Sequence, residues 1–148
     1  QTLLEKRLAI CMTCGRVGSW KGRPTFEELA VMFEGSTASG AERAYRRAVD
    51  RLTELLVAEG AIHAVRLKLK SKTKRKKKIA AAIYEYQADC DGEWGEISLN
   101  FENDTAEIIR FADWDTIKSN RFANKAISYL LSCDDEKLPK ETLVAFEL

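Results

Sequence analysis

Residues 62–87 read IHAVRLKLKSKTKRKKKIAAAIYEYQ, and this stretch decides the fold that the sequence predicts. From Ile62 to Lys70 the apolar and basic residues alternate, as they do in a half-buried β-strand. Seven of the nine residues from Lys70 to Lys78 are basic and none is acidic. Residues 79–87 are again strand-like. The stretch therefore predicts a β-hairpin with a basic tip.

Two helices are predicted before the hairpin. Thr25 and Glu28 form a capping box that begins a short helix over 25–34, which Gly35 ends. Ser39 and Glu42 form a second capping box, and apolar residues repeat at helical spacing over 41–59 as far as Gly60. A further helix is predicted over 2–14.

The second half of the chain is predicted as a continuation of the same fold. Residues 96–101 alternate like a strand, 105–113 are predicted to be helical, and 143–148 are predicted to form a short terminal strand. Ser119 is the expected cap of a further helix, with one apolar face made by Phe122, Ala126, Tyr129, Leu130 and Cys133.

The net charge of +1 conceals a strongly uneven distribution. Residues 1–41 carry a charge of +1, residues 42–78 carry +9, and residues 79–148 carry −9. We expect the middle segment to attract phosphate groups and the last segment to repel them or to contact a basic partner.

Helix, helix, turn, helix and basic hairpin follow one another in the order of a winged helix-turn-helix. The predicted class is α+β: a winged helix-turn-helix of three helices plus a basic β-hairpin wing, with a C-terminal strand and helix extension. Residues 25–34 are the expected positioning helix, 41–59 the recognition helix and 62–87 the wing. The predicted regions are a winged-helix DNA-binding region over 1–87 and an acidic extension over 88–148, which packs on it and serves in dimerisation.

This order predicts a double-stranded DNA-binding protein. The expected contacts in or beside the major groove are Arg43, Arg46, Arg47 and Arg51, since arginine suits both guanine edges and phosphates. The expected contacts on the adjacent backbone or minor groove come from the hairpin: Arg66, Lys68, Lys70, Lys72, Lys74, Arg75, Lys76, Lys77 and Lys78. The alternative for the four arginines is a solvated helix face paired with Asp50 and Glu54.

The same residues carry a resemblance to a known family. Tyr45-Arg46-Arg47-Ala48-Val49 before the hairpin, and the segments 92–101 and 118–123, are similar to pieces of the winged-helix plasmid replication initiators. The resemblance implies a homodimer that binds origin or operator DNA and regulates replication or transcription. The chain ends before a full second winged helix, so a stand-alone regulator fits equally well.

The sequence offers little for catalysis, metals or membranes. It has one histidine and neither a glycine-rich phosphate loop nor a nucleophile elbow, so we expect no enzyme, no catalytic residues and no cofactor. Cys11 and Cys14 have zinc-ligand spacing but lack a second pair, and the carboxylates of 89–93 lack the remaining ligands of a calcium site, so no metal is expected.

We expect a cytoplasmic chain, because no signal peptide and no apolar run of about 18 residues is present. Because the chain begins at Gln1, we also expect it to be trimmed or part of a longer protein.

Two other functions stay open from the sequence alone. One is a protein-interaction module whose acidic half binds a basic partner, and the other is an RNA-binding domain whose basic hairpin follows an RNA groove. A nuclease built from scattered acidic residues is the last alternative.

Overall fold

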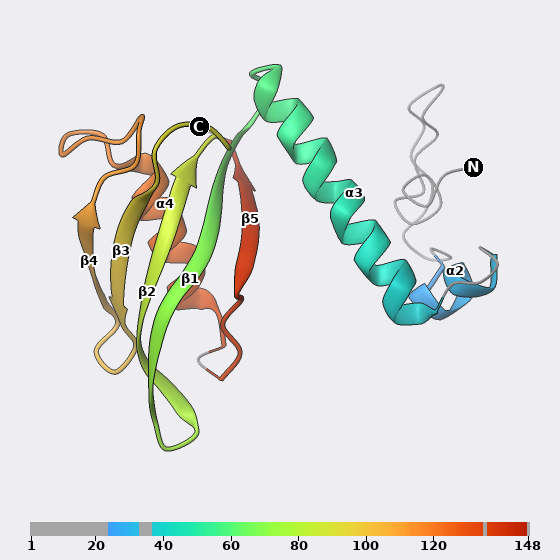
Figure 1. Cartoon of the computed structure of the whole chain (residues 1–148), viewed down its shortest axis with the longest axis horizontal. Helices are drawn as coiled ribbons and strands as arrows, with labels where there is room; N and C mark the ends of the chain where they lie inside the picture. Colours follow the sequence, from blue (N-terminus) through green and yellow to red (C-terminus); the bar gives the residue numbers. More distant parts are fainter. Residues whose placement is uncertain (1–23, 33–36, 135, 148) are drawn as a thin grey trace. The chain divides into compact units, whose positions relative to one another are not determined.

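A computed structural model describes residues 24–32, 37–134 and 136–147 (Figure 1). The predicted helix over 2–14 and its Cys11–Cys14 pair lie outside these residues, as does the stop at Gly35. The chain forms two compact units that divide between Leu52 and Thr53, and each is described by itself.

The first unit contains α2 (Phe26–Met32) and most of α3 (Ala38–Ala58). The predicted capping box at the start of α2 is confirmed: the Glu28 amide donates to Thr25 Oγ1 at 3.2 Å, and the Thr25 amide donates to a Glu28 carboxylate oxygen at 3.2 Å. The Phe26 and Tyr45 rings lie 5.7 Å apart, and Leu29 is fully buried. These contacts pack α2 against α3.

The long helix α3 begins earlier than the sequence predicted. The Gly40 amide donates to Thr37 Oγ1 at 3.0 Å, so Thr37 and not Ser39 caps the helix. Its end is as predicted. Gly60 has φ +73°, its amide donates to the Val57 carbonyl, and the Ala61 amide donates to the Leu56 carbonyl, which together form a Schellman motif.

The second unit is built on a five-stranded antiparallel sheet in the order β4-β3-β2-β1-β5 (Figure 1). Its strands are bounded as follows: β1 (His63–Arg75), β2 (Lys78–Ala88), β3 (Gly95–Asn100), β4 (Thr105–Arg110) and β5 (Glu141–Phe146). The first four follow one another as a meander. The chain then forms α4 (Arg121–Ser132) and returns as β5 beside β1.

The core lies between one face of this sheet and α4. In the part of β1 and β2 that lies within the sheet, alternate residues such as Val65, Leu67, Tyr84 and Tyr86 are buried toward α4, which explains the alternation seen in the sequence. The buried residues of this core include Val65, Leu67, Tyr84, Tyr86, Ile97, Leu99, Phe122, Ala123, Ala126 and Leu130. The predicted amphipathic helix is thus confirmed, as is the terminal strand. The predicted cap is wrong: Asn120 and not Ser119 is the N-cap residue, and the Asp115 carboxylate accepts the first amides of the helix.

The predicted winged helix-turn-helix is wrong. In that fold a two-stranded wing stands beside three helices, whereas here the predicted wing supplies the two longest strands of a five-stranded sheet. Among the described helices only α3 is long, and its one buried residue is Ala41. The apolar side chains of the hairpin pack in one core with α4, which follows them in the chain.

The predicted helix over 105–113 is also wrong. Residues 105–110 form β4, which pairs with β3 from Asn100↔Thr105 to Glu96↔Arg110. Thr105, Ile108 and Ile109 are β-branched, and they follow a tight turn after β3. Helical periodicity in so short a segment is overridden by pairing with the neighbouring strand.

Candidate nucleic-acid interface

The β1–β2 hairpin projects beyond the rest of the sheet. Pairing of β1 with β5 ends at Lys68↔Glu141, and pairing of β2 with β3 ends at Ala81↔Asn100. The two strands continue to pair only with each other as far as Arg75↔Lys78. We call residues 70–79 the arm. On the β5 side, residues 71–75 extend about 17 Å past the last paired strand at about 3.3 Å per residue. On the β3 side, only the part beyond Thr73 and Ala81 lacks a neighbouring strand. Figure 1 shows the hairpin projecting past the ends of the neighbouring strands.

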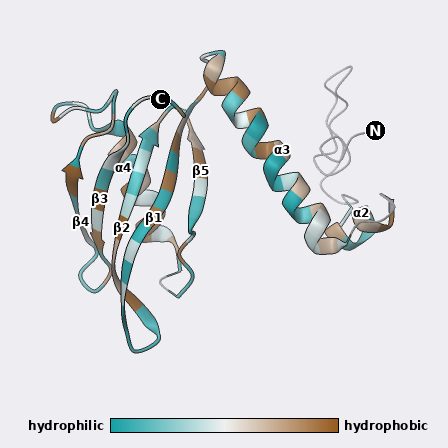
Figure 2. Cartoon of the chain, in the orientation of Figure 1, coloured by the Kyte–Doolittle hydropathy of each residue, from teal (hydrophilic) through white to brown (hydrophobic). Residues whose placement is uncertain are grey.

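Every basic residue of the arm is exposed, and Figure 2 shows the projecting end mainly in the hydrophilic colour. Two of them are held by carboxylates of the sheet: Lys70 Nζ lies 2.7 Å from Glu96, and an Arg75 Nη atom lies 2.9 Å from Glu102. Four others make no ion pair within the described part of the chain: Lys72, Lys74, Lys76 and Lys77. These four are available to an external anion.

The backbone at the tip of the arm is strained at Lys76. Lys76 has φ +59°, in the left-handed region where glycine or asparagine is normally found in a hairpin turn. A register shift between Thr73 and Lys74 adds an irregularity just before the tip. Lys76 therefore occupies a turn position where the left-handed backbone favours glycine or asparagine.

The other two basic residues of the predicted wing belong to the sheet and not to the arm. Arg66 donates to Glu54 of α3 at 2.6 Å. Burial lowers the pKa of Arg66, but its hydrogen bonds to Glu54 and Cys90 outweigh this and raise it. Lys68 is exposed but lies between Glu141 and Glu85 on the neighbouring strands. Nearby carboxylates thus reduce the attraction of both residues for phosphate.

The four predicted arginines of the recognition helix all lie in the first unit. Arg43 and Arg47 are exposed and one helical turn apart, while Arg46 forms an ion pair with Glu42 at 2.6 Å. Arg51 also takes part in an interaction within the chain. These four arginines therefore belong to a different unit of the chain from the arm.

A second feature, a cavity in the sheet unit that Trp114 helps to line, was not predicted from the sequence. The charge pattern alone could not reveal it, because its residues come from four separate segments.

Within the described residues no group of three or more histidine, cysteine or acidic side chains is placed to hold a metal ion. None of the described helices is long and apolar enough to cross a membrane.

Comparison with known protein families, with curated proteins and with solved structures finds no match.

Proposed function

We propose that the chain binds double-stranded DNA through the arm, with Lys72, Lys74, Lys76 and Lys77 contacting backbone phosphates. The observation that carries this proposal is a hairpin that extends past its sheet and presents four cations without a carboxylate partner in the described chain. Concentrated lysines on a projecting ribbon attract a polyanion, and each phosphate contact releases counterions.

The shape of the arm favours duplex DNA over other nucleic acids. A two-stranded ribbon fits the DNA major groove, which is about 12 Å wide, whereas the major groove of A-form RNA is deep and narrow. Residues 70–79 contain no aromatic side chain, so they cannot stack on the bases of a single strand. Lysines that contact phosphates supply affinity and little sequence preference.

This mode of binding replaces the one that the sequence predicted. We do not propose a recognition helix in the major groove, because the winged-helix arrangement that would place it there is absent. A regulator of replication or transcription stays the proposed role. The arginines of α3 are candidates for additional phosphate contacts, since Arg43 and Arg47 are exposed on one face.

The decisive experiment is fluorescence anisotropy on a random duplex of about 30 bp, titrated from about 50 to about 300 mM salt. One variant changes the four arm lysines Lys72, Lys74, Lys76 and Lys77 to Gln. A matched control changes four exposed cations elsewhere in the sheet unit to Gln: Lys118, Arg121, Lys137 and Lys140. Both variants lose the same net charge.

We expect the arm variant to bind at least about a hundredfold more weakly at low salt, while the control loses much less. Duplex RNA of equal length should compete poorly. Equal losses in both variants would show that net charge and not the arm governs binding. A lack of binding by the unmodified chain at the lowest salt would remove the proposal altogether.

A homodimer also stays a proposal. Within the extension over 88–148, the third strand and the helix around 122–131 do not offer an open interface. Both edges of β3 are already paired, and the apolar face of α4 is buried against the sheet. Within the described chain the outer edges of β4 and β5 are the open ones.

A cytoplasmic location is proposed on the free thiols of Cys90 and Cys133, which suit a reducing compartment.

A further inference from the structure

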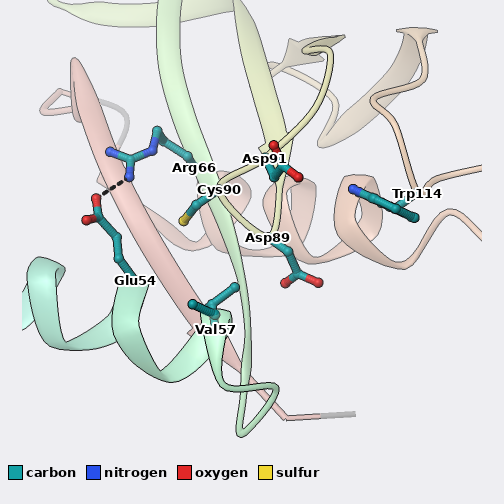
Figure 3. Close-up of a pocket in the computed structure, with 8 residues that line it drawn as sticks. Glu54, Val57, Arg66, Asp89, Cys90, Asp91 and Trp114 are labelled. Carbon is teal, nitrogen blue, oxygen red and sulfur yellow. Dashed lines mark hydrogen bonds and ion pairs between the residues drawn. The ribbon is translucent and has the colours of Figure 1, made fainter.

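A cavity of about 690 Å³ opens in the sheet unit, away from the arm (Figure 3). Its size is typical of sites that hold a small molecule or a single side chain. The last turns of α3 form one wall, β1 and the turn after β2 form the floor, and the loop before α4 supplies an aromatic wall. The lining residues are Glu54, Val57, Ala58, Arg66, Asp89, Cys90, Asp91 and Trp114.

The charges around this cavity favour a cation. Three carboxylates and one guanidinium line it, which leaves an excess of two negative charges. Burial raises the pKa of the Cys90 thiol despite the opposing effect of Arg66, so the thiol is neutral near pH 7 and leaves this balance unchanged. Phosphate groups are repelled here, and the cavity is thus chemically distinct from the arm.

Two of the three carboxylates are already occupied. Glu54 accepts a hydrogen bond from Arg66 at 2.6 Å. One oxygen of Asp89 accepts from the Ala64 amide at 3.1 Å, and the other lies 2.9 Å from His63 Nδ1. The carboxylate of Asp91 is exposed and accepts no hydrogen bond from any described residue. Asp91 is thus the carboxylate available to a ligand.

Trp114 stands at the mouth of the cavity with 68% of its surface exposed. Its φ of +75° is unusual for a bulky side chain. The neighbouring residues hold it there: Asp113 accepts from the Glu93 amide at 3.0 Å, and the buried Asp115 caps α4. Figure 3 shows the nitrogen-bearing edge of the indole turned toward Asp89 and Asp91. An aromatic ring, and a carboxylate that accepts no hydrogen bond from the described residues, therefore lie beside one cavity.

We propose that this cavity binds an organic cation, an alkylammonium or guanidinium group held by the Trp114 ring and the Asp91 carboxylate. The ionised Asp91 carboxylate supplies a charge-assisted hydrogen bond to the cation. A cation held there can lie over a face of the exposed indole, which attracts it through the ring quadrupole, whereas the N–H edge does not. The cation is either a lysine or arginine side chain of a basic protein or a free amine. Both present the same chemistry to the cavity, and the proposal is independent of DNA binding by the arm.

The test follows the indole N–H resonance of Trp114 by NMR, which a Trp114→Phe variant identifies among the three tryptophans of the chain. The probes are N-acetyl-arginine amide, N-acetyl-lysine amide, butylamine and a short arginine-rich peptide. We expect each cation to move the resonance along a saturable curve, with a Kd on the order of 1 mM for the single amino acids. Tighter binding of the peptide than of butylamine identifies a protein ligand, and equal binding identifies a free amine.

Neutral N-acetyl-citrulline amide, which has nearly the same shape as the arginine probe, should leave the resonance in place. Asp91→Asn should raise the Kd of the arginine probe at least about tenfold, whereas Asp104→Asn, an exposed aspartate on the turn after β3, should not change it. Three results would each overturn the proposal: an equal shift with citrulline, a shift with guanosine monophosphate instead, or no shift with any cation.

Discussion

Tyr86 joins three parts of the sheet unit through one buried hydroxyl. Its O–H donates to Asp115 at 3.0 Å and accepts from the Ala112 amide at 3.0 Å. Asp115 in turn accepts from the amides of Phe122 and Ala123, so it caps α4 from a distance. Gly95 lies against the same ring, where a Cβ would have no room. One phenol therefore links the first turn of α4 to the sheet, beside the apolar contacts of the core.

We predict that Tyr86→Phe lowers the free energy of unfolding by about 2 kcal/mol, because it leaves buried groups at Asp115 and Ala112 without their partner. Burial, together with the nearby Asp115 carboxylate, raises the pKa of Tyr86 in the folded chain. The unfolded chain ionises this phenol near its ordinary pKa of about 10, so the native state loses stability as the pH rises above about 10.

Urea unfolding at pH about 8 and about 11 measures both effects. The unmodified chain should lose more stability between the two pH values than the Phe variant does. Tyr84, whose pKa is raised chiefly by burial, causes a remaining loss in both proteins. An identical pH dependence in the two chains would contradict the assigned role of the hydroxyl.

Lys76 provides a second prediction, at the tip of the arm. Asn tolerates the left-handed conformation better than Lys, so Lys76→Asn should stabilise the hairpin by about 0.5–1 kcal/mol while removing one phosphate contact. Lys77→Asn removes the same charge at a position without a positive φ and should give no such gain. Thermal unfolding and the salt dependence of DNA binding measure the two effects separately. Equal melting temperatures for the two variants would rule out strain at Lys76.

At the residue scale, the features that could be predicted from the sequence are those that depend on residues close together in the chain. The Thr25–Glu28 capping box and the stop at Gly60 are short-range patterns, and both were found. The cap that Asp115 provides was not predicted, because its partners on β2 and α4 depend on the folded sheet. Trp114 was missed for the same reason.

At the scale of elements, the open face of the sheet carries a row of charges across all five strands. Lys68 lies opposite Glu141 on one side and Glu85 on the other, Glu85 lies opposite Glu96, and Glu96 lies opposite Arg110. Glu96 is only 9% exposed and faces another carboxylate, so it needs a cation. Lys70, at the root of the arm, supplies one at 2.7 Å.

This arrangement predicts different roles for neighbouring lysines of the arm. Lys70→Ala should lower stability by about 1–2 kcal/mol, or about 3–6 °C in Tm, because it takes a close cation from a nearly buried carboxylate. Lys72→Ala, which removes no ion pair, should change stability by less than about 0.5 kcal/mol. Differential scanning fluorimetry compares them directly. A similar Tm for both variants would show that Arg110 alone is enough for Glu96.

The sequence predicted the hairpin but not its neighbours. Alternation over 62–70 correctly indicated a strand with one buried face, yet it did not say which element covers that face. The cover comes from α4, which follows some 30 residues after β2 in the chain. The third strand pairs along the edge of β2 and the fourth along the edge of the third, and this pairing is not encoded in local periodicity.

At the scale of the whole molecule, the uneven charge seen in the sequence separates into two surfaces of the sheet unit. The lysines concentrate on the arm, while the carboxylates of the later segment lie on the sheet strands and around the cavity. We infer that one end of the unit binds phosphate and that another site binds a cation. A chain near electrical neutrality can in this way hold two ligands of opposite charge.

The salt dependence of DNA binding tests how much of the molecule takes part. Four lysine contacts predict a slope of about −4 for log Kobs against log salt concentration. If the arm carries the binding, the double variant Arg43→Gln/Arg47→Gln should keep this slope within about one unit. The slope of the four-lysine variant should approach zero. A slope that is reduced by about two in the arginine variant would mean that α3 contacts the same duplex as the arm. The first unit would then belong to the binding surface, and the site would be larger than the arm alone.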